Sequence, residues 1–373
     1  MFSFYAVYLK QQQIQNSNSQ LNQQIVGDSA TIKNIQSEVD RLNSEDLRLA
    51  NTQVKKEIAD LKVSFKSTVT AYESMLTIAD NGAKTASMSA KFSSVLSSLA
   101  KDDLPSAQKT LTDLTAIITA EKARLATISA PAIPANVPAS NSPPGSGYSR
   151  QKVTVGDDSF LVDIISADLS STKVIVDTAS DGTCGNNCPV LPLATYVSRS
   201  GAYAGVNGSY FCPDTYPSCS GKTNSFDTLL MNKNKIYFNS DNNVYSNVPV
   251  AIFSGNSARF IGASSGWGRD TGVDAVIANR PLLVMDGNNM FGNGGEDKEV
   301  IRSNRSFLGA TGSTAYIGVV HNATVVESAK VLQAMGIKNA LNLDSGGSTA
   351  LWSGGYKAGP GRNLPNVVLF VRK

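Results

Sequence analysis

The uneven distribution of glycine, proline and cysteine constrains the fold of this chain more than any other feature. Residues 1–127 contain two glycines, one proline and no cysteine or tryptophan, whereas the other 28 glycines, all four cysteines and both tryptophans follow. Glycine and proline interrupt helices and mark turns. The 373 residues therefore predict two folded regions, the first helical and the second rich in turns.

A proline-rich stretch separates these two regions. Its prolines stand among Ala, Ser, Asn and Gly, at positions 131, 134, 138, 143 and 144. Such a composition cannot bury enough apolar surface to fold and is typical of a semi-extended linker. We therefore predict a helical region at 1–127, a linker at 128–150 and a second domain at 151–373.

Apolar residues in the first region recur in steps of three and four. One series precedes a break near residue 50 and another follows it: Ile32, Ile35, Val39, Leu42 and Leu49, then Val54, Ile58, Leu61, Phe65, Val69, Tyr72 and Leu76. A further helical stretch covers about 104–125. This narrow apolar stripe among Gln, Asn, Lys and Glu predicts a coiled coil or a long helical hairpin. The region is expected to act as a spacer or an oligomerising stalk, with homo-oligomers forming through the coiled coil.

Charge and hydropathy exclude several classes of protein. The formal net charge is +3 and 17% of the residues are charged, which argues against a strongly basic nucleic-acid-binding protein. No apolar run reaches the roughly 18 residues of a membrane span. Residues 1–9 are apolar but too short to span a bilayer, so they are either the trailing end of a membrane anchor or the start of an apolar helix.

The four cysteines are clustered and even in number. Their spacing is C-x3-C followed by C-x6-C, formed by Cys184, Cys188, Cys212 and Cys219. Two disulfides in loops are expected, with local pairing favoured, and they predict an extracellular or cell-surface location. A four-cysteine zinc knuckle is the alternative, although neither spacing is the usual C-x2-C. No metal or cofactor is predicted, and the need for a divalent cation stays open.

The second region consists mainly of short segments rich in Val, Ile, Leu and Phe between Gly, Asn and Asp, which predict strands. The expected strands are 152–156, 160–166, 173–178, 226–231, 235–238, 250–253, 258–261, 274–278, 281–285, 315–320, 339–343 and 366–372. One helix is expected at 192–201, and another begins at Thr324, which forms a capping box with Glu327, and ends at Gly336. The predicted class is α+β, with a large mixed β-sheet, few helices and an all-α coiled-coil stalk in front.

The most informative residues follow the predicted strand 339–343. That strand delivers Asp344 into a turn containing Gly346, Gly347, Ser348 and Thr349. A glycine turn lets the backbone approach a ligand closely, and its N–H groups and the two hydroxyls suit phosphate or sugar oxygens. The alternative is a tight turn in which Asp344 satisfies its own backbone.

Four further residues add candidate ligand contacts. Asn207 and Gly208 form a small-residue turn between apolar segments, Arg305 precedes another glycine-rich stretch, and His321 follows the strand 315–320. Arginine offers a planar donor fork that matches phosphate, and histidine is a common acid or base. The structural alternatives are a hairpin turn, a solvated arginine and a histidine that satisfies local carbonyls.

Taken in order, the sequence motifs resemble the phosphodiester glycosidase family over about residues 150–373. The segments that carry the resemblance are LPLATYVSRSGAYAGVNGSYF (191–211), RPLLV (280–284), RSFLG (305–309), ALNLDSGGST (340–349) and NVVLFV (366–371). The resemblance implies functional roles for Asn207, Gly208, Arg305, Asn342, Asp344, Gly346, Gly347 and Ser348. Ser345 departs from the family, which usually has glycine there. That change is mild if Ser345 keeps a negative φ.

The resemblance implies a hydrolase that cleaves the glycosidic C1–O bond of a sugar-1-phosphodiester, in a cell-surface or extracellular glycan. Arg305 is expected to bind the phosphate and Asp344 to act as base or electrostatic stabiliser, while Asn207 and Asn342 position sugar hydroxyls and His321 is a second candidate acid or base. One alternative is a non-catalytic surface module that binds glycan or phosphopolymer. Another is ordinary glycoside hydrolysis by paired carboxylates, for which no partner of Asp344 is evident.

Overall fold

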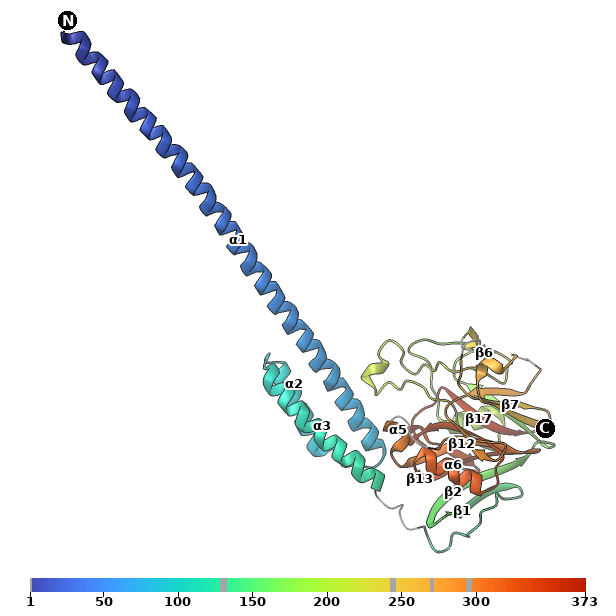
Figure 1. Ribbon diagram of the computed structural model, residues 1–373. Coiled ribbons are helices and arrows are strands. Elements are labelled where there is room, and N and C mark those ends of the chain that lie inside the picture. Colours follow the sequence, from blue (N-terminus) through green and yellow to red (C-terminus); the bar gives the residue numbers. More distant parts are fainter. Residues whose placement is uncertain (1, 128–132, 242–245, 269–271, 293–296) are drawn as a thin grey trace. The chain divides into compact units, whose positions relative to one another are not determined.

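The computed structural model describes residues 2–127, 133–241, 246–268, 272–292 and 297–373 (Figure 1). Met1 and residues 128–132 of the predicted linker lie outside the described residues. The chain divides into two compact units, Met1–Lys66 and Ser67–Lys373. This division falls inside a helix, and the predicted boundaries at 127/128 and 150/151 stay predictions.

The N-terminal region is helical, as predicted. Helix α1 runs without interruption from Phe2 to Asp80, so the break in the apolar stripe near residue 50 changes only the side-chain pattern. Within the second unit, the last turns of α1 pack with α2 (Ala86–Leu99) and α3 (Leu104–Thr127) around an apolar core that includes Ile78, Val95 and Leu114. None of the described helices combines the length and the hydropathy that a membrane span requires.

In the part of the chain that the structure describes, the strands of the second unit form three β-sheets. A seven-stranded sheet has the order β1-β2-β13-β12-β14-β10-β11, and two five-stranded sheets have the orders β16-β15-β4-β17-β3 and β6-β5-β9-β7-β8. The strands of the first sheet are β1 (Gly147–Val155), β2 (Asp158–Asp168), β13 (Thr314–Ala323), β12 (Ser303–Thr311), β14 (Asn339–Ser345), β10 (Leu282–Met285) and β11 (Asn288–Asn289). Those of the second are β16 (Tyr356–Ala358), β15 (Leu351–Ser353), β4 (Ala204–Asn207), β17 (Asn366–Arg372) and β3 (Thr172–Thr178). Those of the third are β6 (Tyr237–Phe238), β5 (Leu230–Met231), β9 (Ala275–Ala278), β7 (Val250–Ser254) and β8 (Ser257–Ile261).

The α+β class is therefore confirmed, but the sheets differ in detail from the expectation of one large mixed sheet. Every pairing between the named strands is antiparallel. Several neighbours in the sheets, such as β1 with β2 and β12 with β13, are joined by short turns, and such hairpins impose antiparallel pairing.

The apolar core lies between the sheets, and helices cover two outer faces. Residues such as Ile165, Val368 and Phe253 come from the three different sheets and share one buried cluster. Helix α6 (Val325–Ala334) packs through Leu332 against the seven-stranded sheet, and α4 (Leu193–Ser200) packs through Tyr196 against the sheet that contains β17.

The predicted limits of α6 are confirmed. The Thr324 side chain accepts a hydrogen bond from Glu327 N at 3.1 Å, and Glu327 Oε2 accepts one from Thr324 N at 2.8 Å, so the capping box is complete. Gly336 has a φ of +75°, which is the left-handed conformation expected just after a helix end.

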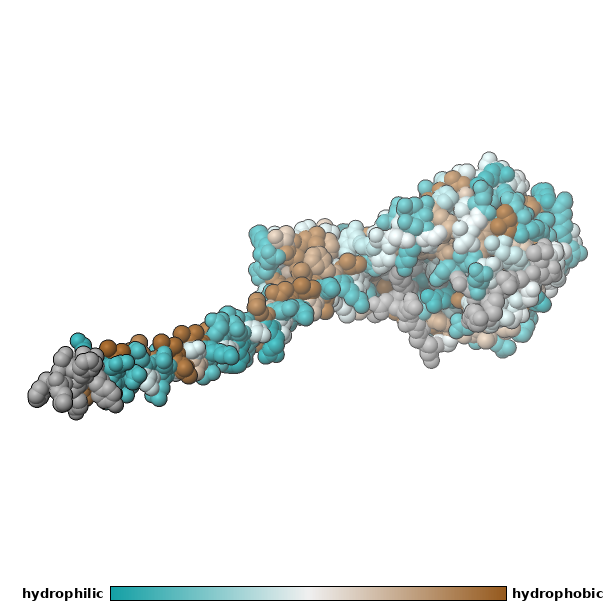
Figure 2. Space-filling model, turned by 90° about the horizontal axis from the view of Figure 1, so that it is seen from above, coloured by the Kyte–Doolittle hydropathy of each residue, from teal (hydrophilic) through white to brown (hydrophobic). Residues whose placement is uncertain are grey.

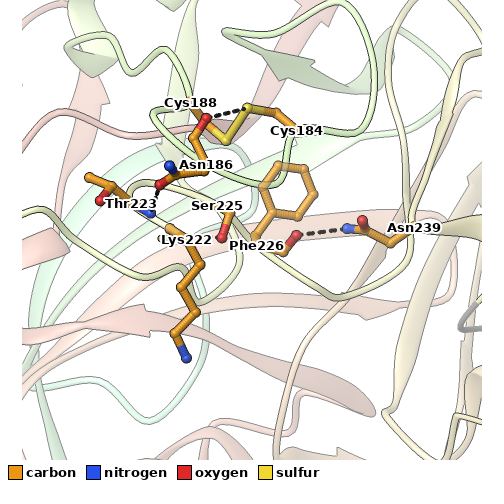
Figure 3. Close-up of a disulfide and its surroundings, with 8 residues drawn as sticks. All are labelled: Cys184, Asn186, Cys188, Lys222, Thr223, Ser225, Phe226 and Asn239. Carbon is orange, nitrogen blue, oxygen red and sulfur yellow. Dashed lines mark hydrogen bonds between the residues drawn. A yellow bond between two sulfur atoms is a disulfide. The ribbon is translucent and has the colours of Figure 1, made fainter. Parts of the chain in front are cut away.

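Both predicted disulfides are present, and both pair neighbouring cysteines. The bonds join Cys184 to Cys188 and Cys212 to Cys219. Figure 3 shows the first bond, with Asn186 in the loop that it closes. The Asn186 Oδ1 atom accepts a hydrogen bond from Thr223 N at 2.8 Å, which ties this loop to the segment after the second disulfide.

Candidate active site

One cavity in the second unit collects several of the predicted site residues. It has a volume of about 290 Å³. Its walls are formed by Thr77, Asp80, Asn81, Tyr210, Phe211, Cys212, Pro213, Tyr216, Ser218, Cys219, Arg280, Glu299, Ser303, Arg305, Asp344, Ser345, Gly346, Gly347 and Arg362. The residues come from segments that are far apart in the sequence, and they include both acidic and basic side chains.

Asp344 reaches this cavity at the end of strand β14. Its backbone N–H donates to Gly208 O at 2.9 Å and its carbonyl accepts from Asn207 Nδ2 at 2.7 Å, so both sides of its backbone are fixed. Its Oδ1 atom accepts from Ser345 N at 2.9 Å. This last contact is the local backbone bond that the structural alternative predicted, yet the carboxyl group also lines the cavity.

Arg305 lines the same cavity from the adjacent strand β12, in which it is the register partner of Ser345. Only 3% of the residue is exposed. Its Nε donates to Ala323 O at 2.9 Å and its Nη2 donates to Ile301 O, and these bonds fix the plane of the guanidinium. Burial lowers the pKa of Arg305, while Tyr210 and the nearby carboxylates, Asp344 among them, raise it.

Asn207 is completely buried, and its side chain forms hydrogen bonds with protein groups around the cavity. Besides the bond to Asp344 O, its Oδ1 accepts from Ser306 Oγ at 2.7 Å and from Ala350 N at 3.1 Å. The side chain therefore joins strands β4, β12 and β14 to the residue just before β15. It does not line the cavity.

Gly208 lets its backbone lie against Asn366 at a distance that leaves no room for a side chain. A Cβ at this position would lie 1.8 Å from Asn366 Oδ1 and 2.7 Å from Asn366 O. The same Asn366 Oδ1 accepts a hydrogen bond from Ser209 N at 2.9 Å. The small-residue turn thus packs against the last strand of the domain and supports the backbone next to Asp344.

Asn342 is also buried and supports the cavity from behind. Its Nδ2 donates to Tyr210 OH at 2.7 Å and to Arg280 O at 3.1 Å. Burial raises the pKa of Tyr210, and the Asp344 carboxylate raises it further, so the phenol stays protonated and keeps a hydrogen to donate. Through these two bonds, Asn342 fixes the positions of Tyr210 and Arg280, which line the cavity from outside its own strand.

The glycine turn after Asp344 has the backbone geometry that the sequence requires. Ser345 has a φ of −138°, so the serine is unstrained where the family usually has glycine. A Cβ on Gly347 would lie 2.4 Å from Arg362 Nη2 and 2.8 Å from Asp80 Oδ2, two atoms that form an ion pair of 2.7 Å. Gly346 and Gly347 line the cavity, whereas Ser348 and Thr349 are buried beside it.

His321 lies in a different group of residues and does not line the cavity. Its Nε2 is 2.7 Å from Asp163 Oδ2 and its Nδ1 is 3.1 Å from Asn304 Oδ1. Asp163 also accepts from Tyr148 OH at 2.7 Å, and burial, together with the hydrogen bond to Asp163, raises the pKa of Tyr148 to about 12. This arrangement resembles the structural alternative, in which the histidine satisfies local groups at the end of a strand.

The cavity also contains residues that the sequence did not single out. Glu299 supplies a second carboxyl group besides Asp344, and Arg280 and Arg362 add two guanidinium groups to that of Arg305. Of these residues, only Arg280 stands in a segment that carries the resemblance, RPLLV (280–284), and no role was assigned to it there. Glu299 stands in a four-residue helix, α5 (Asp297–Val300), that has no recognisable motif.

Chemically, this site combines a buried cation, a carboxylate held at a strand end and a protonated phenol. Such a set can bind an anionic group and stabilise positive charge that develops next to it. In the described residues, no group of three or more His, Cys, Asp or Glu side chains is placed to hold a metal ion.

Comparison with known proteins confirms the resemblance found in the motifs. Residues 200–371 match the family model described as phosphodiester glycosidase. No curated protein matches the chain.

Two solved structures are among those that are similar to this chain. A hypothetical protein from Synechocystis has 14% identity and a TM-score of 0.43, and the match covers 60% of this chain and 62% of that one. The catalytic domain of zebrafish N-acetylglucosamine-1-phosphodiester alpha-N-acetylglucosaminidase, auto-inhibited by its pro-peptide, has 16% identity and a TM-score of 0.49. That match covers 64% of this chain and 87% of the zebrafish chain.

Proposed function

We propose that this chain, whose residues 200–371 match the phosphodiester glycosidase family, hydrolyses the C1–O bond of a sugar-1-phosphodiester. The observation that carries the proposal is the presence of Arg305 and Asp344 in the walls of one cavity. The two disulfides support an extracellular or cell-surface setting for this activity.

Arg305 is the proposed phosphate-binding residue. Because burial makes its charge costly, an anion in the cavity would be stabilised by it more strongly than by an exposed arginine. The guanidinium is also held rigidly by two backbone carbonyls, so little side-chain entropy is lost when the phosphate binds. Arg280 adds a second positive charge to the same wall.

Asp344 is the proposed base. Water attacks C1 of the sugar, its oxygen forms the new bond to C1, and its proton passes to the Asp344 carboxylate. The C1–O bond to phosphate breaks with its electron pair remaining on the phosphate oxygen. A phosphate monoester is already a good leaving group, so this step needs a weaker general acid than ordinary glycoside hydrolysis does. Tyr210, which lines the same cavity as Asp344, supplies a protonated phenol that can serve as this acid.

The test uses the purified full chain and a nitrophenyl diester of a sugar 1-phosphate, with hydrolysis carried out in ¹⁸O-labelled water. We expect release of free sugar together with a phosphate monoester that carries no label, because the C1–O bond is the one that breaks. The Asp344→Asn variant should lose at least ~100-fold in kcat. The matched variant Asp158→Asn changes an exposed aspartate at the start of β2 and should retain full turnover.

Three results would overturn the proposal. Label in the phosphate would show P–O cleavage. Full turnover by the Asp344→Asn variant would show that Asp344 is not the base. Ligand-induced thermal stabilisation without any sugar release, over several sugar 1-phosphate diesters, would instead support the binding-module alternative.

A further inference from the structure

The first unit of the chain carries an apolar stripe that the described residues leave exposed. Eight side chains between residues 14 and 49 are 44–66% exposed, namely Ile14, Leu21, Ile25, Ile32, Ile35, Val39, Leu42 and Leu49. Figure 2 shows apolar side chains in a row along this helix. Isolated exposed apolar residues are common in proteins, but a row of eight on one helix is typical of an interaction surface.

The spacing of the stripe identifies the kind of partner. Ile25, Ile32 and Val39 occupy position a of a heptad repeat, and the other five residues, among them Leu21 and Leu42, occupy position d. A period of 3.5 residues makes the stripe drift slowly around a straight helix. Only a second helix that supercoils with the first one can therefore cover it along its whole length.

We propose that the partner is a second copy of this chain, bound in parallel and in register through residues 14–49. β-Branched residues at a and mainly leucine at d favour parallel two-stranded coiled coils, and Asn18, at another a position, would pair with its counterpart and fix the register.

The available area is sufficient for such a dimer. At about 1.5 Å per residue, residues 14–49 extend over roughly 54 Å, and a contact stripe roughly 10 Å wide then buries about 540 Å² on each copy. The total of about 1,100 Å² exceeds the roughly 1,000 Å² expected of a specific interface. The later apolar residues Val54, Ile58, Leu61 and Phe65, which are 37–51% exposed, can extend the contact beyond the break in the apolar series near residue 50.

The charges beside the stripe permit this pairing. In a parallel dimer, Glu38 and Glu45 at position g lie next to Asn43 and Ala50 at position e of the second copy, so no like charges meet there. Asp28 and Asp46 occupy core positions of the heptad pattern, and each would face its own counterpart. These two pairs weaken the dimer without removing its apolar contacts, and the dimer is therefore reversible and concentration-dependent.

The test compares two leucines of the same helix in the full chain. Leu42 lies in the stripe and Leu47 lies outside it, although both are exposed, at 48% and 72%. By sedimentation velocity over a concentration series, the natural chain should dimerise. Leu42→Asp should raise the dimer Kd at least ~100-fold, whereas Leu47→Asp should leave it within a few-fold. Circular dichroism of both variants checks that the helix is retained.

Two further variants make the outcome decisive. Because all four natural cysteines are in disulfides, Val39→Cys introduces a single thiol, and mild oxidation should join two parallel copies through it, whereas Leu47→Cys should not crosslink. Asp28→Leu should tighten the dimer. A chain that stays monomeric at all concentrations, a dimer unaffected by Leu42→Asp, or a dimer in which Val39→Cys does not crosslink would each overturn the proposal.

Discussion

Asn207 offers the sharpest test of how this site is built, because its side chain contacts three backbone or hydroxyl groups and does not line the cavity. The variant Asn207→Ala removes the bonds to Asp344 O, Ser306 Oγ and Ala350 N, of 2.7, 2.7 and 3.1 Å. Each buried hydrogen bond contributes about 1 kcal/mol, and each partner left unsatisfied adds a desolvation cost of up to ~1–3 kcal/mol. The three lost bonds alone should therefore lower the free energy of unfolding by about 3 kcal/mol, and every partner left unsatisfied increases that loss.

The assay is urea unfolding followed by tryptophan fluorescence. Both tryptophans, Trp267 and Trp352, lie in the sheet region, so the signal reports that region and not the N-terminal helices. The control is Asn234→Ala, which changes an exposed asparagine and should alter stability by less than about 0.5 kcal/mol. If Asn207→Ala kept its full stability and only raised KM for the diester, the residue would bind substrate directly and our interpretation of its role would be refuted.

Two other predictions concern packing and pH. Gly208→Ala should lower the thermal midpoint strongly because its Cβ would meet Asn366 Oδ1 at 1.8 Å, whereas Gly262→Ala, which has no atom within 4 Å of the added Cβ, should have little effect in the same thermal melt. For Asp177, burial raises the pKa, but hydrogen bonds from Arg199 and other donors outweigh it and hold the pKa below the ordinary value. The resulting stability is present above the unfolded pKa of about 4 and is lost as the pH falls through the folded value. Urea midpoints measured between pH 6 and 3 should therefore fall more steeply for the natural chain than for Asp177→Asn, and parallel curves would contradict this.

The sequence predicted those parts of the fold that depend on local patterns. The capping box at Thr324, the left-handed Gly336 and the local disulfides each involve residues within a few positions of one another, so their chemistry is visible in a short window. The α+β class followed in the same way from the period of apolar residues.

The sheet order could not be predicted, because it depends on contacts between distant segments. Strand β12 lies between β13 and β14 and carries Arg305, but the local pattern of apolar residues does not predict that this strand pairs with β14. The predicted strands 226–231 and 235–238 are longer than the observed β5 and β6, whereas 152–156, 160–166 and 315–320 are shorter than β1, β2 and β13, since tertiary packing decides how far a ladder of hydrogen bonds continues. Strands β4, β11, β12, β15 and β16 were not predicted.

The candidate site was predicted where it coincides with motifs and missed where it does not. Asp344 and the glycine turn stand in a recognisable segment, whereas Glu299 reaches the cavity from a four-residue helix with no pattern of its own. The buried asparagines, Asn207 and Asn342, were assigned to sugar hydroxyls, but the structure shows their amides bonded to protein groups. A sequence motif identifies such residues, but it does not show whether their side chains contact the ligand or support the backbone around the site.

The Cys212–Cys219 bond has a consequence for when the site becomes complete. Both cysteines and Tyr216, in the loop between them, form part of the cavity wall. In the reducing cytosol this bond would stay open, and the loop would regain the conformational freedom that the crosslink removes. A newly synthesised chain would then carry an unfinished binding surface, and maturation in an oxidising compartment would be the step that completes it.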